Sequence, residues 1–420
     1  MKNKILAIIC TLTLCFSLTV NLNVLYAENY AELINNEQIT KENFLNLPSE
    51  KLVEDFEYYF KTMKGNSPLF NATKRHIPDL EKQFEEYKKE ILESKSNFEQ
   101  LSLIDEFSRK FLGHNGINFR GCGHAIRIFN SYPKRKTWAN MLSSDPLIKR
   151  NTNLFSCFSW LDMYSASQDS KLKEKRDNIE TKILEPDKIA YIKVRSFSGF
   201  PDSSNDEKTI GEFFEKTKDY ENIIIDITGN SGGTTDYLNC FMPILKKTLV
   251  VTRYMLFKMG DNSSPYINEE YSNEIQPIDK LPEFLNLNQE DKKENTHFAK
   301  RVDSFKSLPN PVRGKVWLLV DDKVFSASEY FTILCKSSKE VTIVGKNTSG
   351  DGLSAVDPIL MILPNSKVAM RYSVDYGLNE DGSCNAECGT KPDIVSPDGE
   401  DPLTTCLKAI KKDQEQMKCW

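Results

Sequence analysis

The chain has 420 residues, enough for one large domain or two of ordinary size. Hydrophobic residues make up 39% and charged residues 27% of it, a composition typical of globular proteins. The formal net charge of −5 provides no basic footprint for nucleic acid or anionic lipid. We therefore expect two lobes and no nucleic-acid partner.

Residues 1–27 have the features of a secretory signal peptide. Lys2 and Lys4 precede an apolar run over residues 5–20, and the small residue Ala27 offers a cleavage point. The run is shorter than the roughly 20 residues of a membrane-spanning helix, so a retained anchor is the alternative. We expect a protein that is soluble after signal removal and secreted or otherwise extracytoplasmic; the exact cleavage site stays open.

The cysteines agree with an oxidising compartment but do not define a pairing. Removing Cys10 and Cys15 with the signal from the ten cysteines leaves eight, an even number. The residues from Cys384 to Cys419 are close enough in sequence to be the first candidates for disulfides. No spacing of cysteines with the four histidines is typical of a zinc site, and we expect no metal and no other cofactor.

The N-terminal part of the chain, residues 28–130, is predicted to form a small helical lobe. Between Leu52 and Leu112 the apolar residues recur at helical intervals, which predicts three amphipathic helices. The positions are Val53, Phe56, Phe60, Met63, Leu80, Phe84, Tyr87, Ile91, Leu101, Ile104, Phe107 and Phe111. Residues 131–186 then form a connecting segment.

After Asp187 the pattern changes to short apolar runs separated by helical stretches, which predicts an α/β domain over residues 187–410. The expected strands are Ile189–Val194, Asn222–Ile227, Leu249–Leu256, Lys315–Val320, Val341–Val344 and Ile359–Leu363. A polar stretch from Lys258 to Pro311 interrupts them, with one weak helical segment near Phe298. So long a loop is usually a functional cover or an insertion.

One candidate site is a glycine turn that follows a buried strand. The strand ends at Asp226, and Gly232 and Gly233 follow. Glycines let backbone N–H groups approach a ligand, as an oxyanion hole or a phosphate cradle requires. The Lys-Ser/Thr ending of a phosphate loop is absent, which disfavours nucleotide binding. A plain tight turn is the alternative.

A second candidate is Ser326, between the strand Lys315–Val320 and an apolar helix that begins in Ser326-Ala327-Ser328-Glu329. A serine at a strand-to-helix turn presents its hydroxyl beside the positive end of the helix, where an oxyanion is stabilised. The alternative is that Ser326 or Ser328 only caps the helix.

A third candidate is His124, which follows Gly121-Cys122-Gly123 and precedes an apolar run. Histidine meets the pKa requirement of a general base for a serine without large perturbation. His114, ten residues earlier, also has glycine neighbours. A structural role for either histidine is the alternative.

The order of these motifs resembles the tail-specific, or C-terminal processing, serine peptidases and their tricorn-like relatives. The similarity runs from about Val53 to Val395 and includes further segments of the α/β part. They are Tyr191-Ile192-Lys193-Val194, Ile343-Val344-Gly345-Lys346-Asn347-Thr348-Ser349-Gly350 and Glu387…Gly389…Pro392-Asp393-Ile394. The resemblance implies a ClpP/crotonase-like α/β peptidase domain preceded by a small helical lobe.

Carried over to this sequence, the family pattern makes Ser326 the nucleophile and gives Ser328 a structural role. The backbone N–H groups of Gly233 and Ala327 would form the oxyanion hole. This agrees with the separate argument from glycine access and the position of Ala327 at the helix start.

The sequence departs from the processing branch at the base. That branch has a lysine in a Gly-Lys-Gly segment, where this chain has Gly350-Asp351-Gly352. Asp351 cannot act as a desolvated amine. The tricorn-like branch takes a histidine from the preceding lobe, which corresponds to His124, and completes the relay with a glutamate, which corresponds to Glu387. Gly123 stands where that branch has a serine, so the chain is closer to the Ser/His branch with an altered partner for His124.

We therefore expect an exported serine peptidase that acts on peptides or proteins through an acyl-enzyme on Ser326. A non-catalytic ligand-binding protein on the same fold, and an esterase or amidase, are the alternatives. The choice between His124 and His114, the substrate preference, the disulfide pattern and the oligomeric state stay open.

Overall fold

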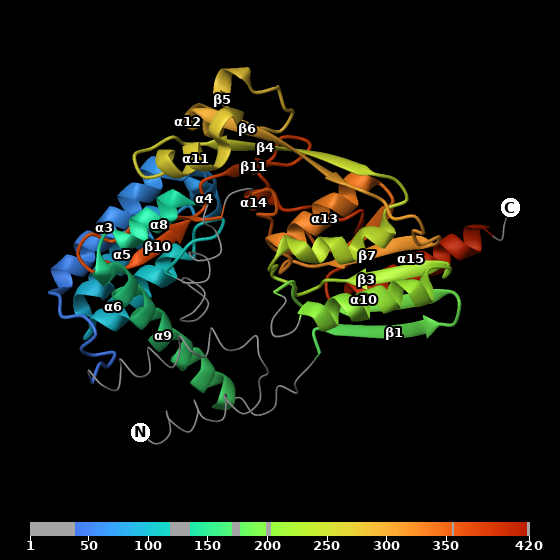
Figure 1. Ribbon diagram of the computed structural model, residues 1–420, viewed down its shortest axis with the longest axis horizontal. Helices are drawn as coiled ribbons and strands as arrows, with labels where there is room; N and C mark the ends of the chain where they lie inside the picture. The colour runs from blue at the N-terminus through green and yellow to red at the C-terminus, as the bar shows by residue number, and fades with distance from the viewer. Residues whose placement is uncertain (1–37, 118–134, 170–176, 199–202, 355–356, 418–420) are drawn as a thin grey trace. The chain divides into compact units, whose positions relative to one another are not determined.

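The computed structural model describes residues 38–117, 135–169, 177–198, 203–354 and 357–417 (Figure 1). The chain divides into two compact units. The first unit contains residues 1–173, 258–273 and 356–374, and the second contains residues 174–257, 274–355 and 375–420. The chain thus leaves the second unit twice and returns to it. From the sequence we predict two continuous segments, residues 28–130 and 187–410, which do not include these two excursions.

The first unit is mainly helical. Its described elements are α3 (Ser49–Asn66), α4 (Phe70–His76), α5 (Leu80–Glu93), α6 (Asn97–Ser108), α8 (Lys136–Ser143), α9 (Pro146–Asp169), α11 (Ser264–Tyr271) and the antiparallel hairpin of β9 (Ile359–Ile362) and β10 (Ala369–Tyr372). Aromatic rings join α3, α5 and α6: Phe56 lies 4.7 Å from Phe84 and 5.0 Å from Phe107 between ring centroids. The sequence predicted three helices in this stretch, but the structure has four, because the seven residues of α4 are too few to show a period.

The second unit contains a six-stranded sheet in the order β1-β2-β3-β7-β8-β12. Its strands are β1 (Ile179–Glu185), β2 (Ile189–Val194), β3 (Asn222–Asp226), β7 (Lys315–Val320), β8 (Val341–Gly345) and β12 (Ile394–Val395). Only β1 pairs antiparallel, and the other pairs are parallel. A helical N-terminal region and an α/β domain were predicted from the sequence, and this mixed α/β fold confirms them.

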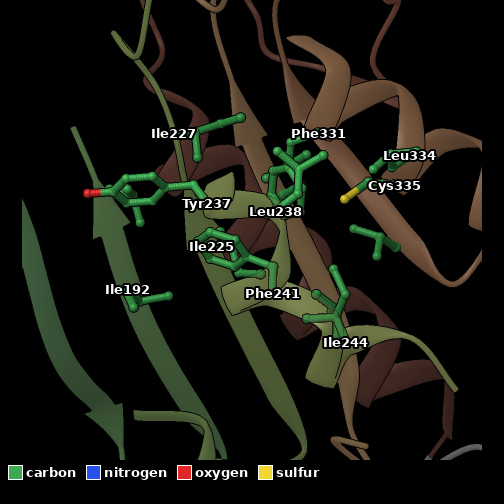
Figure 2. Packing of buried hydrophobic residues seen from close by; sticks show 14 of the residues in the cluster. Ile192, Ile225, Ile227, Tyr237, Leu238, Phe241, Ile244, Phe331, Leu334 and Cys335 are labelled. Carbon is green, nitrogen blue, oxygen red and sulfur yellow. The ribbon is translucent and has the colours of Figure 1, made fainter. Parts of the chain in front are cut away.

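Helices cover both faces of this sheet, as apolar strands in a parallel sheet require. One face packs against α10 (Ser203–Thr217), the 3-10 helix η1 (Thr235–Ile244) and α13 (Ala327–Ser338). Figure 2 shows this core, in which the rings of Phe241 and Phe331 lie 4.7 Å apart. The other face packs against α15 (Pro402–Met417) through Cys406 and Ile410.

A four-stranded sheet in the order β11-β4-β6-β5 completes the second unit. Its strands are β4 (Leu249–Phe257), β5 (Ile275–Pro277), β6 (His297–Phe305) and β11 (Tyr376–Leu378), and η2 (Ser272–Glu274), η3 (Ile278–Lys280), α12 (Gln289–Glu294) and α14 (Asn385–Cys388) lie in its connections. The helical segment predicted near Phe298 is wrong, because Phe298 lies on β6. The segment has the period of a strand with one exposed face, and its polar side was mistaken for a loop.

The structure shows the state of several cysteines. Cys157 is disulfide-bonded, whereas Cys384 and Cys406 have unpaired thiols. The prediction that the C-terminal cysteines pair first is therefore wrong for these two, and Cys419 lies outside the described residues. Among the described helices, none has the length and apolarity needed to cross a membrane.

Candidate active site

The sheet brings the glycine turn and Ser326 to the same edge. Strands β3 and β7 are parallel neighbours, with Asp226 opposite Leu319. Because parallel neighbours end at the same edge of a sheet, the turn that follows β3 and the segment that follows β7 emerge side by side.

Ser326 precedes α13 with an uncommon backbone conformation. Its φ is 60° and its ψ is −124°, a conformation that costs energy for a residue with a Cβ. Its N–H donates to Gly350 O at 3.1 Å and its carbonyl accepts from Tyr330 N at 2.9 Å, which fixes the backbone on both sides. The side chain is half-buried and makes no capping hydrogen bond to the helix. The hydroxyl of Ser326 is therefore not used for capping.

Ser328, in contrast, is fully buried in a local network. Its Oγ lies 2.6 Å from the carbonyl oxygen of Asn230 and 2.9 Å from that of Phe325, and it accepts from Phe325 N at 3.2 Å. These contacts tie the start of α13 to the glycine turn.

The glycine turn lies directly against Ser326. A Cβ on Gly232 would come within 2.8 Å of Ser326 Cβ and 3.0 Å of Ala327 N, so only glycine permits this approach. The neighbouring Gly233, with φ 147°, forms a parallel bridge with Phe197. Phe197 N–H donates to Gly232 O at 3.0 Å, and Phe197 O accepts from Thr234 N at 2.8 Å.

Ala327 is the first residue of α13, so its N–H has no partner within the helix and lies at the positive end of the helix dipole. The structure thus brings Ser326 and Ala327 against Gly232, and Gly233 is the next residue in the chain. An oxyanion hole needs backbone N–H groups close to the serine hydroxyl, and Ala327 N–H at the start of α13 is a candidate for one of them.

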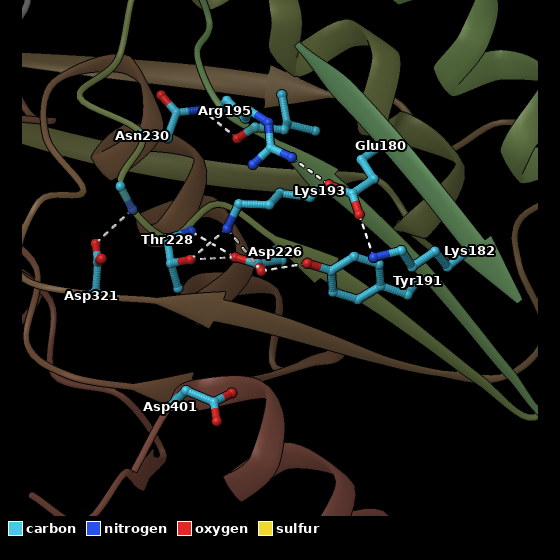
Figure 3. A network of polar contacts seen from close by, with 12 residues as sticks. Glu180, Lys182, Tyr191, Lys193, Arg195, Asp226, Thr228, Asn230, Asp321 and Asp401 are labelled. Carbon is cyan, nitrogen blue, oxygen red and sulfur yellow. Dashed lines mark hydrogen bonds and ion pairs between the residues drawn. The ribbon is translucent and has the colours of Figure 1, made fainter. Parts of the chain in front are cut away.

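A polar network holds the start of the glycine turn (Figure 3). Asp226 Oδ1 accepts from Thr228 N at 2.8 Å and from Thr228 Oγ1 at 2.7 Å. Asp226 Oδ2 accepts from Tyr191 OH at 2.7 Å and from Lys193 Nζ at 3.0 Å. Burial and the Asp226 carboxylate raise the pKa of Tyr191. Asp321 Oδ1 accepts from Gly229 N at 2.9 Å, which joins the turn to the segment after β7.

Glu329, a buried acid in the first turn of α13, has a second buried acid, Asp351, near it. Glu329 is fully buried, and its Oε1 accepts from Asn385 Nδ2 at 2.8 Å and Thr390 Oγ1 at 2.6 Å. Burial raises its pKa to about 7, hydrogen bonds oppose the shift, and the negative charge of Asp351 adds to it. Asp351 is buried too and accepts from Ser354 Oγ at 2.6 Å. Asp351, in the Gly350-Asp351-Gly352 segment, therefore places one buried acid near another.

Glu387 lies on α14, and Gly350 connects this helix with Ser326. Gly350 O accepts from Ser326 N, and a Cβ on Gly350 would come within 2.0 Å of Asn385 O and 3.2 Å of Ala386 Cα. The side chain of Glu387 is half-buried. Glu387 therefore belongs to the segment that packs behind the Ser326 backbone.

The structure describes only one of the two histidines proposed as the base. His124 and Gly123 lie outside the described residues. His114 belongs to the first unit, where its N–H donates to Ser373 Oγ at 2.8 Å. Across the described residues, no group of three or more His, Cys, Asp or Glu side chains is arranged to hold a metal ion. A surface hollow is lined by Lys218, Lys246 and residues 309–313, which come just before β3, β4 and β7 in the chain. It therefore lies at the starts of these strands, whereas Ser326 follows the end of β7.

The comparisons with known proteins identify a family and a fold. The model of peptidase family S41 matches residues 188–396. A candidate peptidase from Parabacteroides merdae is 17% identical with a TM-score of 0.50, over 87% of this chain and 96% of the other. Mature CPAF complexed with lactacystin is 10% identical with a TM-score of 0.54, over 89% and 99% of the two chains.

The photosystem II D1 C-terminal processing protease is 15% identical with a TM-score of 0.35, over 55% of this chain and 50% of the other. No curated protein matches the chain in sequence. At these identities the first two structural similarities establish the fold alone, and the family is established by the match over residues 188–396.

Proposed function

Because the chain belongs to peptidase family S41 over residues 188–396 and is a serine-type peptidase, we propose that it hydrolyses peptide bonds through an acyl-enzyme on Ser326. The observation that carries this proposal is the geometry of Ser326. Its backbone is held at positive φ at the start of α13, its hydroxyl does not cap the helix, and Gly232 lies against its Cβ.

In the proposed reaction, a histidine takes the proton from Ser326 Oγ as the oxygen attacks the substrate carbonyl. The amides of Gly233 and Ala327 stabilise the resulting oxyanion. The histidine then gives its proton to the leaving amine, and an activated water hydrolyses the ester. His124 is the proposed base, on the family resemblance, and Glu387 its proposed orienting partner. His114 is the alternative base.

The surroundings of Asp351 support a histidine base rather than an amine. Asp351 stands where the processing branch has its lysine, and it lies beside Glu329, whose pKa is raised by burial. A buried pair of acids offers no group that could act as a neutral amine at this position. The reaction therefore needs a base from elsewhere, and the proposal assigns it to the Ser/His branch of the family.

We also propose that the protein is exported. The features of residues 1–27 support this, and the disulfide at Cys157 agrees with an oxidising compartment. Peptides or proteins outside the cytoplasm are then the substrates.

The test is the pH dependence of labelling by a fluorophosphonate, measured by intact mass in the wild type, His124→Ala and His114→Ala. The proposal expects a single adduct on Ser326, with a rate that rises through a pKa near neutrality and collapses only in His124→Ala. Collapse in His114→Ala alone would move the base to His114. No adduct in the wild type at any pH would favour a ligand-binding protein instead.

A further inference from the structure

Asn230 lies between β3 and the two glycines of the turn and is completely buried. Its Nδ2 donates to Val194 O, at the end of β2, at 3.1 Å. Its Oδ1 accepts from Gly232 N at 2.9 Å, and its carbonyl oxygen accepts from Ser328 Oγ at 2.6 Å. A single side chain and its own carbonyl therefore join β2, the glycine turn and α13.

The turn needs such a tie because of its composition. Gly232 and Gly233 must be glycines, since a Cβ on either would meet neighbouring backbone at 2.6 Å or less. Two successive glycines can adopt many backbone conformations at little cost, so the sequence that permits the close approach does not by itself fix an orientation.

The peptide between Gly232 and Gly233 is oriented from two sides. Phe197 N–H holds Gly232 O at 3.0 Å, and Asn230 Oδ1 holds the N–H at the other end of Gly232. In a planar trans peptide the C=O and the following N–H point in opposite directions. The N–H of Gly233 therefore points away from Phe197, and Gly233 itself is exposed.

Resting on the proposed function, we propose that Asn230 is a positioning residue of the oxyanion hole. It presets the Gly232–Gly233 peptide so that Gly233 N–H faces the oxygen that develops when Ser326 attacks. Asn230 does not touch the substrate; it acts through Gly232. Its hydrogen bonds to Val194 O and to Gly232 N make this orientation depend on β2, a rigid element, rather than on the loop alone.

The experiment compares Asn230→Asp with Asn230→Leu in fluorophosphonate labelling, resolved into the limiting rate and the half-saturating concentration. Asp keeps an oxygen for Gly232 N–H, whereas Leu has similar size and no acceptor. We expect Asn230→Leu to lower the limiting rate about 100-fold, the effect of losing one oxyanion donor, with half-saturation changed by less than about threefold. Asn230→Asp keeps the acceptor for Gly232 N–H but loses the donor to Val194 O, so it should recover part of that rate.

A matched control is Asn97→Leu. Asn97 is also buried and binds both backbone groups of one residue, accepting from Leu47 N at 2.9 Å and donating to Leu47 O at 3.0 Å, within the first unit. Its loss should lower the melting temperature without changing the labelling rate of the folded protein. A labelling rate of folded Asn230→Leu equal to that of the wild type would overturn the proposal.

Should Asn230→Leu fail to fold, the crystal structure of the phosphonylated wild type decides. Gly233 N within about 3 Å of the phosphonyl oxygen, with Gly232 N still bound to Asn230, supports the proposal. A flipped Gly232–Gly233 peptide overturns it while leaving Ser326 as nucleophile. Absence of any adduct on Ser326 would overturn the proposed function, and with it the role of Asn230.

Discussion

The Cα of Gly232 faces Ser326 so closely that a methyl group there would lie 2.8 Å from Ser326 Cβ and 2.6 Å from Phe325 O. Neither atom can move freely, because Ser326 N is bound to Gly350 O and its carbonyl to Tyr330 N. The turn after β3 and the start of α13 therefore pack as one unit, which keeps Ser326, the proposed nucleophile, in a fixed position relative to the glycine turn.

The first prediction concerns this contact. Gly232→Ala should destabilise the protein by about 3 kcal/mol, because the methyl group overlaps backbone and the residue has φ 96°. It should also abolish labelling of the folded fraction. Gly229→Ala is the control: Gly229 has φ 78° but open space around its Cα, so about 1 kcal/mol is expected. Urea unfolding measures the stability of both variants. Equal losses of stability would show that a Cβ at Gly232 does not overlap Phe325 O and Ser326 Cβ.

The second prediction concerns Lys193 and Asp226. Asp226 is buried, and the Lys193 side chain, 19% exposed, neutralises it while donating to Thr228 Oγ1 at 2.8 Å. Lys193→Met should cost about 2 kcal/mol, since the carboxylate loses its charged partner. Lys182→Met, whose side chain is 57% exposed in its pair with Glu180, should change stability by less than about 0.5 kcal/mol. Denaturant midpoints of the two variants provide the measurement, and similar values would mean that the Asp226 network contributes little.

The third prediction concerns pH. Because burial raises the pKa of Glu329 to about 7 from the unfolded value of 4.5, the folded protein binds the proton more tightly than the unfolded chain. The contribution of protonated Glu329 to the free energy of unfolding is therefore fully present below pH 4.5. It is lost as the pH rises to about 7, and the total loss is about 3 kcal/mol.

Glu329→Gln should remove this loss, because a glutamine can accept from Asn385 and Thr390 and carries no charge. The variant should match the wild type near pH 4.5 and exceed it in stability at pH 8. Guanidinium unfolding at a series of pH values measures the difference. If the difference in the free energy of unfolding between Glu329→Gln and the wild type stays constant from pH 4.5 to 8, Glu329 does not titrate in this range.

Much of the fold could be predicted from local pattern. The strand Lys315–Val320 begins and ends as expected, since apolar β-branched and aromatic runs that are buried on both faces leave little ambiguity. The sequence does not predict strand β6, because its exposed face carries the polar residues Lys300 and Ser304 and periodicity over so polar a stretch is weak. The returns of residues 258–273 and 356–374 to the first unit leave no signal in local pattern at all.

At the site, the glycines and the serine could be predicted from the sequence, but the residues that hold them in place could not. Gly232, Gly233 and Ser326 stand out because glycine pairs and strand-to-helix serines have a known physical use. Asn230 carries no such signal, because its bonds to Val194 and Ser328 join segments that are remote in sequence. Glu329 gave one usable signal, an acid at the start of an apolar helix, but its pairing with Asp351 depends on tertiary packing.

The most direct test of the central claim is the rate of casein hydrolysis by the wild type, Ser326→Ala and Ser328→Ala. We expect cleavage by the wild type, none above background by Ser326→Ala, and reduced but measurable cleavage by Ser328→Ala, because the Ser328 hydroxyl binds the glycine turn. Hydrolysis by Ser326→Ala at the wild-type rate would contradict the account, because the acyl-enzyme could then not form on Ser326.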